Sequence, residues 1–90
     1  MADALSRAAD VPMRILELAA AAAEMASALA ADGKPVLRGD ALTAVLLAHA
    51  AARSAAILVR IDLAGAPGDP RLDRAERLLA RIAQSADRVG

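Results

Sequence analysis

The chain has 90 residues, of which 58% are hydrophobic, and it contains no phenylalanine, tyrosine or tryptophan. Its 11 basic and 11 acidic residues cancel, so it lacks the positive charge and the aromatic rings with which many proteins bind nucleic acid. The absence of cysteine excludes disulfides and thiolate zinc sites, and fits a cytoplasmic protein. We expect a single small domain over residues 1–90, whose marginal core has to be supplemented by association.

The first helix is predicted from about residue 12 to 31, after an N-terminus without a secretory signal. Asp10 is expected to cap it, and Pro12 suits a first turn. Gly33 is expected to end it before Pro35. Two stripes recur at three- and four-residue spacing. The bulky stripe is Ile15, Leu18, Ala22, Met25 and Leu29, and the small stripe is Ala19, Ala23, Ala26 and Ala30.

The second helix is predicted from about residue 40 to 64, with Asp40 as its N-cap, and it is apolar on nearly every side. Its small stripe, Ala44, Ala48, Ala51 and Ala55, matches that of the first helix. This predicts close antiparallel packing of the two helices, joined by a loop of about eight residues. The remaining apolar positions are Val45, Leu46, Leu47, Ile57, Leu58, Val59, Ile61 and Leu63.

A helix that is apolar all round has to be covered on every side, which two neighbours can hardly do. We therefore expect an all-α, three-helix antiparallel bundle that assembles into a larger helical bundle as an oligomer. A membrane span is not expected, because it needs about 20 apolar residues in a row and Arg53 and Arg60 interrupt this helix.

The third helix is predicted over residues 70–89, after a breaker at 65–68, with Asp69 as its N-cap and Pro70 at its first position. Its apolar stripe is Leu72, Ala75, Leu79, Ile82, Ala86 and Val89. Four arginines interspersed with acids are interpreted as a solvated face, and they do not indicate nucleic-acid binding. They are Arg74, Arg77, Arg81 and Arg88.

The residues that could carry chemistry are few, and each has a structural interpretation beside the functional one. His49 is either a core histidine or a general acid–base group. Arg53 and Arg60 are either partners in ion pairs or a clamp for a substrate anion. Asp62 opposes the helix dipole at a helix end, where solvent exposure would also explain it. No metal site is expected, since no cysteine and no second histidine accompany His49.

Three segments resemble the C-terminal half of the cyclodeaminase/cyclohydrolase family, which includes formimidoyltetrahydrofolate cyclodeaminases and methenyltetrahydrofolate cyclohydrolases. They are A-D-V-P-M at 9–13, G-x-x-x-x-x-G-D at 33–40 and A-I-L-V-R-I-D-L at 56–63. Two asparagines of the family pattern fall on Leu58 and Asp62, and the family's glycine-rich N-terminal segment is absent. The resemblance implies a homodimer that binds a one-carbon tetrahydrofolate derivative as substrate and needs no further cofactor.

Two hypotheses follow from these patterns. In the first, the protein is a member or truncated relative of this folate family with weak or lost activity. The candidate catalytic residues are then Asp40, His49 and Asp62, with Arg53 and Arg60 binding substrate. In the second, it is a non-enzymatic helical module that binds another chain through the second helix. A separate chain that supplies the glycine-rich half is a further candidate partner, and a ligand pocket without chemistry is a weaker alternative.

Overall fold

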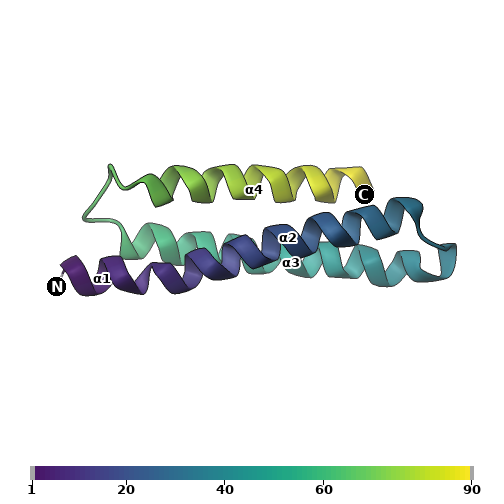
Figure 1. Cartoon of the computed structure of the whole chain (residues 1–90), viewed down its shortest axis with the longest axis horizontal. Coiled ribbons are helices and arrows are strands. Elements are labelled where there is room, and N and C mark those ends of the chain that lie inside the picture. Colours follow the sequence, from purple (N-terminus) through teal and green to yellow (C-terminus); the bar gives the residue numbers. More distant parts are fainter. Residues whose placement is uncertain (1, 90) are drawn as a thin grey trace.

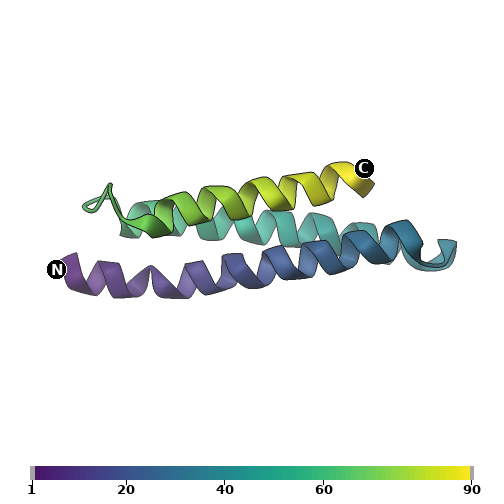
Figure 2. The same ribbon diagram turned by 45° about the horizontal axis from the view of Figure 1, so that its top comes forward.

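The computed structural model describes residues 2–89, and over this range the chain is helical without a strand. Its elements are α1 (Ala2–Ala8), α2 (Asp10–Asp32), α3 (Pro35–Asp62) and α4 (Pro70–Val89). The three long helices lie side by side in an elongated bundle of 51 × 17 × 13 Å (Figure 1). α3 runs antiparallel to α2, and α4 runs in the same direction as α2 (Figure 2). The predicted all-α three-helix fold is confirmed.

The helical path into α2 begins earlier than predicted. The N–H of Ala9 donates to the carbonyl oxygen of Leu5, and the N–H of Met13 donates to that of Ala9, each at 3.1 Å. The chain therefore continues from α1 into α2, with a break where Pro12 has no N–H to donate. The prediction that Asp10 caps the helix is wrong, since no side chain caps it and residue 9 is already helical.

The turn between α2 and α3 is only Gly33 and Lys34, much shorter than the predicted loop. Gly33 ends α2 as predicted, and its N–H donates to the Leu29 carbonyl oxygen at 2.7 Å. Pro35 then starts α3 at the first position, where its missing N–H costs nothing. Asp40 consequently lies inside α3, and the prediction that it is an N-cap is wrong.

Alanine residues form the contact between α2 and α3, the most extensive helix pair in the bundle. The predicted small stripe of α2 is buried in full. On α3 the prediction is only partly right, because Ala44 and Ala51 are exposed. Because α3 packs against both α2 and α4, its buried residues form a line along the side of the helix that faces both neighbours. That line is Ala41, Val45, Ala52, Ala55, Ala56 and Val59.

Helix α4 closes the core by burying Leu78, Ile82 and Ser85. Its predicted stripe faces the same way, with Ala75 and Ile82 buried, although the side chain of Val89 lies outside the described ones. The Asp69 cap is confirmed, because Asp69 Oδ1 accepts a hydrogen bond of 2.9 Å from the backbone N–H of Arg71.

The four arginines of the predicted solvated face of α4 are all exposed, and two of them also form ion pairs with α2. Arg74 pairs with Glu17 at 3.1 Å, and Arg81 pairs with Glu24 through its Nε at 2.9 Å. Arg74 and Arg81 are seven residues apart on α4, and Glu17 and Glu24 are seven residues apart on α2. Both ion pairs therefore form together only when α4 lies parallel to α2 in this register. Such half-exposed pairs contribute little energy. Their role is therefore to favour one register over its neighbours.

A single guanidinium ties the N-terminal region to the start of α4. Arg71 donates to the backbone oxygen and the Oγ of Ser6, at 2.7 and 2.8 Å, and to Asp10 Oδ1 at 2.8 Å. It also donates to both carboxylate oxygens of Asp69 at 3.0 Å. Because Arg71 donates hydrogen bonds to it, the Asp69 carboxylate has its pKa held below the ordinary value of 3.8. The same hydrogen bonding raises the pKa of Arg71.

We expect the free energy of unfolding to fall on acidification partly through Asp69. Its lowered folded-state pKa contributes stability above pH 3.8, and this contribution is lost as the pH falls through the folded-state value. Chemical denaturation from pH 6 downwards measures the effect. Asp69→Asn keeps a cap acceptor but does not titrate, so its stability should fall less steeply below pH 4. If the stability of Asp69→Asn falls below pH 4 as steeply as that of the unmodified protein, Asp69 does not contribute to the pH dependence.

Candidate functional site

The five residues singled out from the sequence are spread along α3 and do not converge on one cavity. From Asp40 to Asp62 the helix extends about 33 Å, at about 1.5 Å per residue. Asp40 lines a surface depression with Leu29 and Leu37, near the turn that joins α2 to α3. Asp62 lines another depression at the opposite end of the bundle. The two carboxylates therefore cannot act on one small substrate within a single copy of the chain.

The basic candidates lie closer together on the side of α3 that adjoins α4. Arg60 donates to Glu76 of α4 at 3.0 Å, which matches the ion-pair interpretation of this residue. His49 is half-buried one turn before the exposed Arg53, so both reach the same flank of the helix. No cluster of three or more potential metal ligands occurs within residues 2–89. This flank of α3 therefore carries three basic side chains, of which Arg60 is already paired with a carboxylate of α4.

The most prominent feature of the surface is an apolar face on the side of α2 and α3 away from α4. On α2 it consists of Val11 and the bulky stripe, in which Met25 is 69% exposed and Leu18 is 55% exposed. The adjoining part of α3 carries apolar residues at a seven-residue repeat. We call this surface the α2/α3 face; its members are Val11, Ile15, Leu18, Ala22, Met25 and Leu29 of α2 and Leu37, Ala44, Ala51 and Leu58 of α3.

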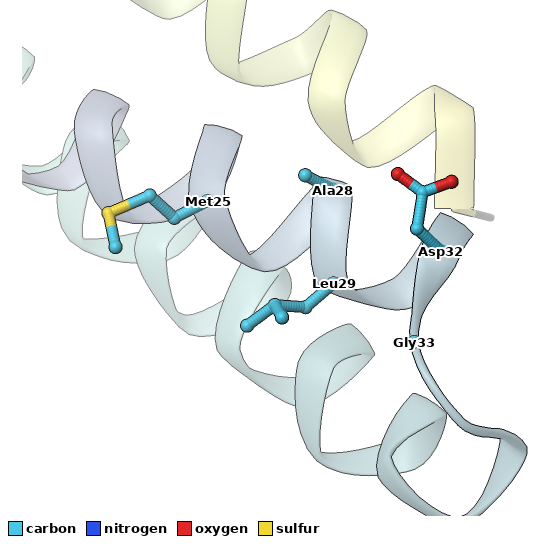
Figure 3. A pocket seen from close by; sticks show the side chains of 5 residues that line it. All are labelled: Met25, Ala28, Leu29, Asp32 and Gly33. Atoms are coloured by element: carbon cyan, nitrogen blue, oxygen red, sulfur yellow. The ribbon is translucent and has the colours of Figure 1, made fainter.

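The α2/α3 face is hollowed at the end of the bundle where α2 turns into α3. Met25, Ala28, Leu29, Asp32 and Gly33 line an open depression there, with the side chains of Met25 and Leu29 projecting from α2 (Figure 3). On the other side of Leu29, a second hollow is lined by residues of both helices. Leu29 therefore forms a ridge between two apolar depressions. Bulky side chains of a partner can fit into these depressions.

The structure corrects where the uncovered surface lies. The sequence predicted it on the second helix alone, and part of it is there, since Leu46, Leu47 and Ile61 are more than half exposed. It also extends over α2, whose bulky stripe was not predicted to be a docking surface. The signal was available, because α2 carries two apolar stripes and packing the small stripe against α3 leaves the bulky stripe outside.

By length and composition alone, α3 could also cross a membrane, since its mean hydropathy over an 18-residue window is 1.8. An apolar core helix of a soluble protein passes the same test, so the finding is weak evidence for a span.

The chain is similar to a known protein family over most of its length. The model of the family described as Formiminotransferase-cyclodeaminase matches residues 1–83, which is most of the chain. Searches of curated proteins and of solved structures gave no match.

Proposed function

The chain belongs to the formiminotransferase-cyclodeaminase family, and we propose that within it the chain acts as a helical association subunit, completed when a second copy covers its α2/α3 face. The observation that carries the proposal is the exposure of Leu18 and Met25, on a helix that already packs its alanines against α3. Exposed apolar area of this extent on a soluble protein marks an interaction surface.

The size of the face suits a second copy of the chain. From Val11 to Leu29 it is about 27 Å long, and two helices 8–10 Å apart make it about 20 Å wide. The footprint is therefore about 500 Å² for each copy. Pairing two copies covers about 1,000 Å², which reaches the size of a specific interface. A single additional helix from another chain would leave part of it uncovered.

Light scattering after size exclusion tests the association. The protein should elute as a dimer, with about twice the mass of the 9.1 kDa chain. Leu18→Glu places a charge in the middle of the face and should give monomers that remain helical. Leu46→Glu is the matched control, because Leu46 is also more than half exposed but lies outside the α2/α3 face, and it should remain dimeric. A monomer at all concentrations, or association only with lipid vesicles, would overturn the proposal.

Family membership favours a second candidate function, turnover of a one-carbon tetrahydrofolate derivative. Arg53 and Arg60 would bind the anionic part of the substrate, while Asp40, His49 or Asp62 would move protons. Since Asp40 and Asp62 lie at opposite ends of α3, the site would combine residues of two copies or of a chain carrying the glycine-rich half. This activity needs no cofactor beyond the substrate and belongs in the cytoplasm.

The absorbance of 5,10-methenyltetrahydrofolate measures this activity. A rate above buffer that falls in Arg53→Gln would support it, with the dimer mass of the variant as a control. No acceleration, together with no rise in melting temperature on adding the folate, would reject it and leave the association proposal intact.

A further inference from the structure

We infer that the two copies meet through an antiparallel contact of α2 with α2 of the partner, centred on Ala22. The inference rests on the proposed association and adds its geometry. The bulky stripe is nearly symmetric about Ala22, with Ile15 and Leu29 seven positions to either side and Leu18 and Met25 closer in. A two-fold axis at Ala22 therefore sets Ile15 against Leu29 of the partner and Leu18 near Met25 of the partner.

The centre of the stripe is also its smallest side chain. Ala22 is exposed and stands between larger apolar residues on both sides. A small residue at a crossing point lets two helices approach toward the short end of the usual 8–10 Å separation. The larger residues on either side then contact those of the partner.

Two charges at the rim of the face distinguish an antiparallel from a parallel contact. Arg14 and Asp32 are exposed and lie on the same flank of α2, and neither makes an ion pair within the described part of the chain. With the axis at Ala22, Arg14 of one copy and Asp32 of the other differ by about 3 Å along the helix, within reach of an arginine. A parallel contact would instead oppose like charges at both ends. Opposite charges across an interface select its orientation.

Cysteine cross-linking tests the register, and the chain has no native cysteine to interfere. Ala22→Cys places two thiols at the axis, so a short bifunctional maleimide should join most of the protein into covalent dimers. Leu29→Cys is the matched control, because residue 29 belongs to the same α2/α3 face. In the antiparallel register its two copies lie about 21 Å apart along the helix, at about 1.5 Å per residue, and should remain largely unlinked. Efficient linking at both positions would indicate a parallel contact and overturn the inference.

Charge reversal provides an independent readout. Arg14→Asp and Asp32→Arg should each weaken the dimer, raising its Kd by roughly tenfold at low salt because two like-charge contacts arise per dimer. The double variant restores opposite charges and should return Kd close to that of the unmodified protein. If the protein is a dimer whose Kd is the same in all these variants, only the antiparallel register is contradicted. If no dimer forms at all, the proposed association itself is contradicted.

Discussion

Leu16→Ala should lower the free energy of unfolding by about 2–5 kcal/mol, the usual loss when a buried leucine is truncated. Leu16 is fully buried, and it is one of few large side chains in a core made mostly of alanine. The surrounding alanines have few rotatable groups with which to fill the space that the leucine leaves. Since small domains have only about 5–15 kcal/mol of stability, this variant should lose much of its own.

Chemical denaturation at one fixed protein concentration measures this effect, because association itself adds stability. The control is Leu46→Ala, which removes the same atoms from an exposed position on α3. It should stay within about 0.5 kcal/mol of the unmodified protein. Equal losses in the two variants would mean that the packing of α2 differs from the one described.

Alanine substitutions of two glycines should change stability in opposite directions. At Gly33 an added Cβ would overlap the carbonyl oxygen of Leu29, which accepts the N–H of Gly33 itself. The turn has only one other residue before Pro35, so the backbone between the two helices has to shift to relieve the overlap. We expect Gly33→Ala to cost about 1–3 kcal/mol, the range for a side chain forced into occupied space.

Gly39 lies within α3, where an added Cβ meets nothing within 4 Å. Replacing a helical glycine by alanine gains about 1 kcal/mol, because the unfolded chain loses conformational freedom. Thermal melts of the two variants should therefore lie on opposite sides of the unmodified protein. A melting temperature that falls in both would show that Gly39 makes a contact absent from the described structure.

The candidate site was predictable in its residue types but not in its arrangement. His49, Arg53 and Arg60 share one flank of α3 because helical spacing places them there. Whether an arginine is free or paired depends on a helix far along the chain, and Arg60 meets Glu76 of α4. The contacts of Arg71 with Ser6 and Asp10 span more than 60 residues, so no local pattern indicated them.

The helix caps, too, were only partly predictable from the local sequence. Asp69 before Pro70 was recognised correctly, because the breaker before it leaves the helix no earlier start. Asp10 precedes Pro12 and Asp40 follows Gly39, which are also signals of a helix start, yet each lies within a continuous helical path. A cap residue acts only where the chain leaves the helical conformation, and upstream residues decide that.

The sequence by itself determined that this protein is all-α, where its third helix begins, and that it has more apolar surface than three helices can cover. These properties depend on composition and on spacing within one helix. The spacing also predicted that the alanine stripe of α2 would face α3. Only the tertiary structure decided which residues of α3 are buried, because α3 packs against both α2 and α4. Only one side of α2 can face its neighbours. The alanine side faces them because its small side chains allow the helices to approach closely. The bulkier residues were left at the surface because α3 and α4 already occupied both positions beside the alanine stripe.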